Sequence, residues 1–267
     1  MTSDSLFKFF FYTFAASWLC FAVALAVPQF GGSIFLLGVF MPSFVAILLT
    51  AKAGGTTGLQ ALFDRVFQWR VGARWYVFAA GYMLAIRLVA ALVQRLATGH
   101  WPQFSHIAWY ALVAVTIVSL PVQAGEEIGW RGYALPRLGP RMGYAGGSVL
   151  LGVMWALWHF PTFYLFPGNG NYGQSFPLFL VGVTAISVAM AWLYVHTNGS
   201  ILLACLMHSA IDQTHEIVQS GMAVIGPLSI NTTLISWITL LLLWIGAAYF
   251  IIRMRTMKPL AIDAALT

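Results

Sequence analysis

Long apolar runs separated by short polar segments dominate the chain, and they predict membrane-spanning helices. A helix needs about 20 apolar residues to cross a bilayer, and the chain has room for about eight such runs with short connections. The predicted spans are Phe7–Val27, Gly32–Leu49, Trp75–Val93, Ile107–Gly132, Ala145–Phe160, Pro177–Val195, Ser200–Val218 and Thr232–Ile252. The predicted fold is therefore an all-α, polytopic membrane bundle in which residues 1–267 form a single membrane domain.

The composition supports a membrane protein and argues against nucleic-acid binding. Charged residues make up 7% of the chain, against about a quarter in ordinary soluble domains, and hydrophobic residues make up 60%. The net charge of +6 comes from basic residues placed between the apolar runs, as membrane orientation requires. Cys20 and Cys205 both lie inside apolar runs, so they predict neither a disulfide framework nor a metal cage.

The basic residues also predict the orientation of the chain. With eight spans, the Lys and Arg clusters after the second, fourth and last spans all fall on the same side as Lys8. The positive-inside rule makes this side cytoplasmic, with both termini inside. We interpret the apolar run Phe7–Val27 as a retained first span rather than a signal peptide, because it is too long for a signal-peptide core. The predicted location is the cell (inner) membrane of a bacterium, which the protein crosses several times.

Two connecting segments have their own patterns. Leu59–Val71 places apolar residues at helical spacing, with Asp64, Arg65 and Gln68 off that stripe, which predicts a helix lying flat on the cytoplasmic surface. The glycine-rich stretch Gly139–Gly147 predicts a tight hairpin between the fourth and fifth spans.

Three of the predicted spans bring acidic residues and imidazoles to one place. Only seven acidic residues occur in the chain, and Glu126, Glu127 and Asp212 lie within predicted spans, where an ionisable group is costly and indicates a functional site. Glu126 and His159 are equidistant from the turn, each roughly 25 Å along a helix, so they can face each other. His208 and Asp212 are one helical turn apart on the seventh span, which starts on the same side. The site is therefore predicted to lie within the membrane.

The spacing within this cluster suggests a role for each residue. Glu127 and Arg131 are four residues apart, in the order that favours a structural ion pair, which leaves Glu126 as the preferred general base toward water. His159, His208 and Asp212 could instead bind a divalent metal, with zinc as the preferred ion. Both mechanisms stay open from the residues alone. The standard signatures of soluble zinc proteases and serine hydrolases are absent from the sequence.

The order and spacing of these residues resemble the CPBP family of intramembrane proteases. The matching motifs are Glu126-Glu127-x-x-x-Arg131-Gly132, Trp155-x-x-x-His159 and His208-x-x-x-Asp212, within a core of about residues 108–215. That family groups CAAX prenyl endopeptidases, which remove the last three residues after a prenylated Cys, with bacterial Abi proteins linked to bacteriocin processing and self-immunity. The resemblance implies an intramembrane metalloendopeptidase, or a glutamate-dependent one.

Carried over to these positions, the resemblance assigns a role to each motif. It makes Glu126 the catalytic base, with Glu127, Arg131 and His159 supporting it. It makes His208 and Asp212 the pair that stabilises the oxyanion or binds the metal. A membrane-associated or prenylated peptide is the implied substrate, and the lipid bilayer is the other partner.

Two positions depart from the family pattern. Trp155 stands where the second motif usually has Phe, and Asp212 stands where CAAX enzymes often have Asn. Because an ionised Asp cannot donate a hydrogen bond to an oxyanion, Asp212 shifts weight toward metal binding. Two other functions compete with the protease. One is a proton-coupled transporter, although we find no counterpart repeat; the other is a non-catalytic membrane scaffold or immunity protein.

Overall fold

The computed structural model describes residues 4–218, 226–258 and 260, and within these residues the chain is helical apart from turns, loops and one isolated β-bridge. The elements are α1 (Asp4–Ala26), η1 (Pro28–Phe30), α2 (Gly31–Val66), α3 (Ala73–Thr98), α4 (Trp109–Val118), α5 (Leu120–Gly129), the π-helical η2 (Trp130–Ala134), α6 (Leu135–Trp158), α7 (Thr162–Leu165), α8 (Phe176–His196), α9 (Ile201–Ile217) and α10 (Leu234–Met254). The predicted all-α membrane bundle is confirmed.

Six helical segments in the described part of the chain are long and apolar enough to cross a membrane, where the sequence predicted about eight spans. Each predicted span nevertheless lies on helix. The difference has two causes. The fourth and fifth predicted spans belong to one continuous helical run, Leu120–Leu165, and the seventh corresponds to α9, which has only 17 residues.

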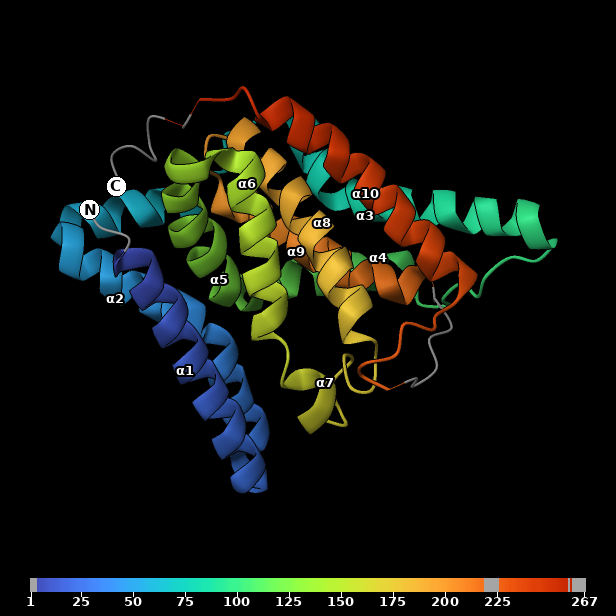
Figure 1. Ribbon diagram of the computed structural model, residues 1–267, viewed down its shortest axis with the longest axis horizontal. Helices are drawn as coiled ribbons and strands as arrows, with labels where there is room; N and C mark the ends of the chain where they lie inside the picture. Colours follow the sequence, from blue (N-terminus) through green and yellow to red (C-terminus); the bar gives the residue numbers. More distant parts are fainter. Residues whose placement is uncertain (1–3, 219–225, 259, 261–267) are drawn as a thin grey trace.

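Glycines with left-handed backbone angles bend two of the long helices. Gly143 has φ 72° and ψ 157°, so the predicted hairpin is present and divides α6 into two limbs. Gly55 has φ 56° and ψ −145°, angles that are essentially restricted to glycine, and it divides α2 in the same way. As a result, the first limb of α2 pairs with α1 in a projecting hairpin, while the second limb turns back along the bundle (Figure 1).

The second limb of α2 corresponds to the predicted surface helix, but its polar side chains do not all face outward. Phe63, Asp64 and Phe67 are exposed, whereas Arg65 is only 1% exposed. Arg65 therefore lies inside the bundle rather than at the membrane surface. Periodicity alone could not show this, because η2 and α8 offer Arg65 polar partners within the bundle.

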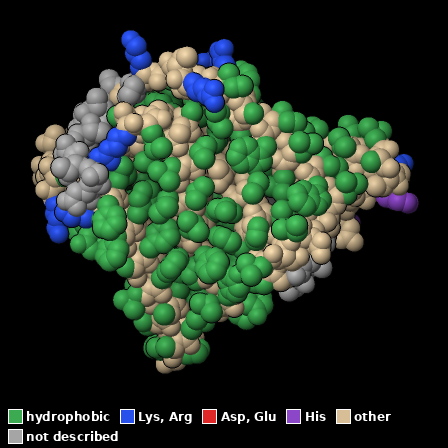
Figure 2. Space-filling view, in the orientation of Figure 1, with side chains coloured by type: hydrophobic (Ala, Val, Ile, Leu, Met, Phe, Trp, Pro, Cys, Tyr) green, Lys and Arg blue, Asp and Glu red, His purple; other side chains and the backbone are tan. Residues whose placement is uncertain are grey.

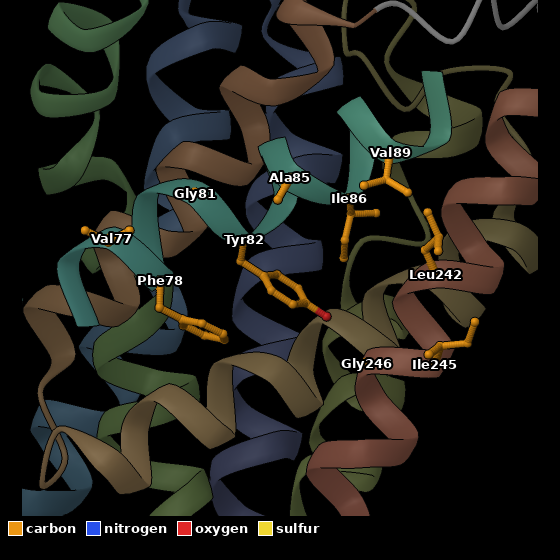
Figure 3. Close-up of a pocket in the computed structure, with 10 residues that line it drawn as sticks. All are labelled: Val77, Phe78, Gly81, Tyr82, Ala85, Ile86, Val89, Leu242, Ile245 and Gly246. Atoms are coloured by element: carbon orange, nitrogen blue, oxygen red, sulfur yellow. The ribbon is translucent and has the colours of Figure 1, made fainter. Parts of the chain in front are cut away.

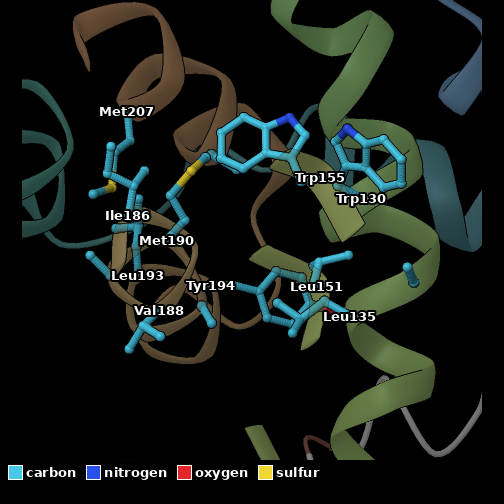
Figure 4. Close-up of a cluster of buried hydrophobic side chains, with 14 of the residues drawn as sticks. Trp130, Leu135, Leu151, Trp155, Ile186, Val188, Met190, Leu193, Tyr194 and Met207 are labelled. Atoms are coloured by element: carbon cyan, nitrogen blue, oxygen red, sulfur yellow. The ribbon is translucent and has the colours of Figure 1, made fainter. Parts of the chain in front are cut away.

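The core lies among α5, η2, α6, α8 and α9, and all of these helices except α8 carry residues of the predicted site. In Figure 4, Trp130 and Trp155 lie side by side, Met190 of α8 points toward Trp155, and Tyr194 of α8 lies beside Leu135 and Leu151 of α6. Small residues bring α6 against α8: Ser187 Oγ donates to the Ser148 carbonyl at 2.9 Å, and Gly152 lies against the Thr184 backbone. The site is thus built on the most buried helices.

Replacement of Gly152 by Ala is expected to lower the free energy of unfolding by about 1–3 kcal/mol, because overpacking a close helix contact displaces backbone. The new Cβ would lie 2.7 Å from Thr184 Cα and 2.8 Å from Ser187 Cβ. Thermal unfolding in detergent measures the change. Gly146→Ala is the control, since its nearest neighbour is the Met142 side chain at 3.6 Å. Equal midpoints for both variants would contradict the close packing.

The outer surface agrees with a membrane environment. Hydrophobic side chains cover most of the face in Figure 2, and Lys and Arg side chains gather along its upper and left edge. An apolar groove runs between α3 and α10, lined by Val77, Phe78, Gly81, Tyr82, Ala85, Ile86, Val89, Leu242, Ile245 and Gly246 (Figure 3). None of these residues belongs to the predicted site.

Candidate active site

A buried ion pair forms the base of the site. Glu127 is fully buried on α5, and its Oε1 and Oε2 accept hydrogen bonds from Arg131 Nη1 at 2.8 and 3.1 Å. Arg131 is itself 0% exposed, and its guanidinium stacks over the Trp155 ring at 4.2 Å from the ring centre. The structure therefore contains the pair that the i,i+4 spacing predicted.

Glu126 points to a different partner from its neighbour. It is 6% exposed, and its Oε2 accepts a hydrogen bond from Trp155 Nε1 at 2.7 Å. Trp155 lies on α6, beyond the Gly143 hairpin, so the predicted antiparallel arrangement of the two helices is present. The hydrogen-bond partner of Glu126 is Trp155, one helical turn before the predicted partner His159. This bond holds one carboxylate oxygen of Glu126, Oε2.

His159 follows Trp155 by one helical turn, at the end of α6. Its Nδ1 lies 2.9 Å from the Trp155 carbonyl oxygen. Because a carbonyl only accepts, Nδ1 carries a hydrogen and donates it to this oxygen, and Nε2 has a lone pair when the ring is neutral. Trp155 thus contacts both Glu126 and His159, and it links the first two motifs directly.

His208 brings the third motif to the ion pair. Its Nδ1 lies 2.8 Å from Glu127 Oε1, so a single carboxylate oxygen is shared by Arg131 and His208. An ionised Glu127 can only accept, so His208 donates from Nδ1 and turns Nε2 toward Asp212 Oδ2, 4.0 Å away. The ring also stands at right angles to Trp155, with 5.0 Å between the ring centres.

Asp212 lies where the site opens. Its side chain is 48% exposed, compared with 7% for His208. Gln123, only 6% exposed, donates from Nε2 to Asp212 Oδ2 at 2.8 Å and fixes the carboxylate. All six predicted site residues, Glu126, Glu127, Arg131, His159, His208 and Asp212, therefore belong to one connected cluster.

The sequence analysis missed two contributions to this cluster. Gln123 precedes Glu126 by one helical turn, and a polar side chain at that spacing in an apolar span was a usable signal. The sequence analysis noted Trp155 only as a replacement of the usual Phe, but its indole N–H is a hydrogen-bond donor that Phe lacks. This departure from the family pattern therefore adds a contact to Glu126.

The donor types suit a divalent metal, but their spacing does not. His159 and His208 both donate from Nδ1 and leave Nε2 available, as metal-binding histidines commonly do. Among the described residues, however, no three His, Cys, Asp or Glu side chains are arranged closely enough to hold an ion. We therefore assign no catalytic step to a metal.

Replacement of Trp155 by Phe is expected to lower the free energy of unfolding by about 1–3 kcal/mol, because the buried Glu126 carboxylate loses its donor. Reversible unfolding in mixed detergent micelles measures the change. The matched control is Trp101→Phe, whose indole is 54% exposed. If the two variants were equally stable, the contact between Trp155 and Glu126 would contribute nothing.

The fold and this cluster define a polytopic α-helical membrane protein with a buried site of carboxylates and imidazoles. Residues 104–214 match the family model described as Type II CAAX prenyl endopeptidase Rce1-like, and this interval contains every residue of the cluster. The chain is also 25% identical to CAAX prenyl protease 2 of Methanococcus maripaludis over 198 residues, which cover 69% of this chain and 72% of that protein. These matches confirm the resemblance to CAAX prenyl endopeptidases that the motifs indicated.

Proposed function

We propose that the chain is an intramembrane endopeptidase that hydrolyses a peptide bond near the C-terminus of a prenylated, CAAX-type protein or peptide. The observation that carries this proposal is the pair of differently held carboxylates. Glu127 is neutralised by Arg131 and orients His208, while Glu126 accepts from the neutral indole of Trp155 and has no cation bonded to it in the described residues. Two neighbouring acids thus receive two environments, as separate catalytic roles require.

Glu126 acts as the general base. Its Oε1 takes a proton from a water molecule, and the resulting hydroxide forms a bond to the carbonyl carbon of the substrate. Trp155 holds Oε2 and prevents rotation of the carboxylate away from the water. When the carbon–nitrogen bond breaks, the same proton passes from Glu126 to the leaving amine, so the base is regenerated. His159 Nε2 accepts a hydrogen bond from the second O–H of the water, and this hydrogen stays on the oxygen that attacks the carbonyl carbon.

His208 stabilises the oxyanion. Its bond from Nδ1 to Glu127 favours the imidazolium form, whose Nε2–H donates to the negative oxygen of the tetrahedral intermediate. Asp212, 4.0 Å from Nε2, adds negative charge that supports the imidazolium, and Gln123 keeps the Asp212 carboxylate in place. In this assignment the oxyanion donor is His208. Asp212 therefore does not need to donate, although CAAX enzymes often have Asn at its position.

Purified protein tests the proposal with a farnesylated, fluorescence-quenched CAAX peptide and the same peptide without the lipid. We expect cleavage of the farnesylated peptide after the modified Cys, little cleavage of the other, and none of either by Glu126→Ala. Chelator and added zinc form a second arm, in which the glutamate-only route predicts unchanged rates. Equal signal from wild type and Glu126→Ala would reject the enzyme and leave a membrane scaffold. Loss with chelator and recovery with zinc would establish a metal enzyme.

A further inference from the structure

A buried arginine outside the three motifs connects both halves of the site. Arg65 lies in the second limb of α2 and is 1% exposed, although the sequence placed it on the membrane surface. Its Nη2 donates to the Gly132 carbonyl at 2.8 Å, and its Nη1 donates to Tyr194 Oη at 3.1 Å. A guanidinium buried in this way serves a specific contact, because its desolvation is costly.

Gly132 is a sensitive point for this contact. It lies in the π-helical η2, next to Arg131, where the helix departs from regular α geometry. A Cβ at Gly132 would meet Ile201 Cδ1 at 2.8 Å and Leu62 Cδ1 at 3.1 Å. The second limb of α2 and the start of α9 therefore converge on the turn that positions Arg131.

Gln68, one turn after Arg65, makes the second connection. Its side-chain Nε2 donates to the Thr197 backbone carbonyl at 2.7 Å, and the backbone carbonyl of Gln68 accepts from Ser200 Oγ at 2.7 Å. Ser200 is the N-cap of α9 and accepts from the Leu203 amide at 3.3 Å. Gln68 thus holds the turn from which α9 carries His208 into the site.

We propose that Arg65 is a positioning residue for catalysis, an inference that rests on the proposed function. The second limb of α2 fixes η2 and the α8–α9 turn relative to each other, and this spacing sets the contact between Glu127 and His208. Arg65 acts through the Gly132 carbonyl and touches neither substrate nor the reacting atoms. Its loss moves His208, the oxyanion donor, out of alignment with the base Glu126.

The test compares Arg65→Met with Arg70→Met, whose guanidinium is exposed on the same segment. Hydrogen–deuterium exchange of the full-length protein in detergent reports the structural part without reference to activity. We expect faster exchange in peptides covering residues 126–134 and 200–208 of Arg65→Met only. The kinetic part uses the farnesylated peptide, and we expect kcat to fall about ten- to hundredfold with KM nearly unchanged, as small misplacements of catalytic groups do. Arg65→Lys is expected to recover part of kcat, since one ammonium cannot span both acceptors.

The two readouts separate the possible failures. Unchanged exchange in residues 126–134 overturns the positioning role, whatever the activity. Faster exchange with unchanged kcat also overturns it and leaves Arg65 a purely structural contact, as does a rise in KM equal to the loss of kcat/KM. If wild type shows no cleavage dependent on Glu126, the proposed function fails, while the exchange data still decide whether Arg65 holds the two segments together.

Discussion

Replacement of Glu126 by Gln is expected to lower kcat by roughly 10²–10⁴-fold, the usual contribution of a general base. Gln has the same volume, and its amide oxygen can still accept the 2.7 Å hydrogen bond from Trp155 Nε1. The substitution therefore removes the ability to take a proton and leaves the local packing in place. Steady-state cleavage of the farnesylated peptide by the purified variant measures the loss, with KM expected to stay close to that of wild type.

Asp64→Asn is the matched control, because Asp64 is an exposed carboxylate on the second limb of α2. We expect its kcat and KM to equal those of wild type. A Glu126→Gln variant that retained wild-type kcat would show that another group activates water, and it would remove Glu126 from the mechanism.

Replacement of Glu127 by Leu is expected to lower the free energy of unfolding by about 3–5 kcal/mol. The substitution leaves the guanidinium of Arg131 buried without its carboxylate, and it also removes the acceptor of His208 Nδ1. Burial of an uncompensated charge is the dominant cost, since both Glu127 and Arg131 are 0% exposed. Unfolding in mixed detergent micelles measures the effect.

The double variant Glu127→Leu/Arg131→Met separates stability from catalysis. Removing both charges is expected to recover most of the lost stability, because two apolar side chains replace the pair. Cleavage is expected to stay low, since His208 still lacks the acceptor that favours its imidazolium form. A single variant as stable as wild type would show that the ion pair does not stabilise the protein, and recovery of cleavage in the double variant would exclude Glu127 as the partner that activates His208.

The sequence was sufficient for the fold class and for the residues of the candidate site. Isolated acids and imidazoles in apolar spans are rare enough to be informative, and the Gly143 hairpin allowed their depths to be compared. This is why Glu126 and the Trp155–His159 motif could be placed on facing helices before the structure was known. The shared partner of Arg131 and His208, a single oxygen of Glu127, was not predictable, because spacing gives the face of a helix and not the rotamer of a side chain.

The environment of Arg65 shows a second limit of sequence reasoning. A basic residue between two apolar runs normally lies at the membrane surface, and the apolar stripe of Leu59–Val71 supported that interpretation. Its burial depends on the bend at Gly55 and on acceptors from η2 and α8, which are distant in sequence. Such tertiary partners override local amphipathicity and leave no periodic signal.

The π-helical turn at Trp130–Ala134 also has an evolutionary consequence. A π turn holds about one more residue than an α turn, so a one-residue deletion within it would restore regular helix and leave the segments on either side in nearly the same relative rotation. A deletion in the regular helix between Glu127 and this turn, or in the first limb of α6, would instead rotate the two segments by about 100° relative to each other. Descendants of this chain could therefore lose a residue from the π turn and keep Glu126 and Glu127 facing Trp155 and His208, whereas a loss in the regular helix beside it would turn both acids away.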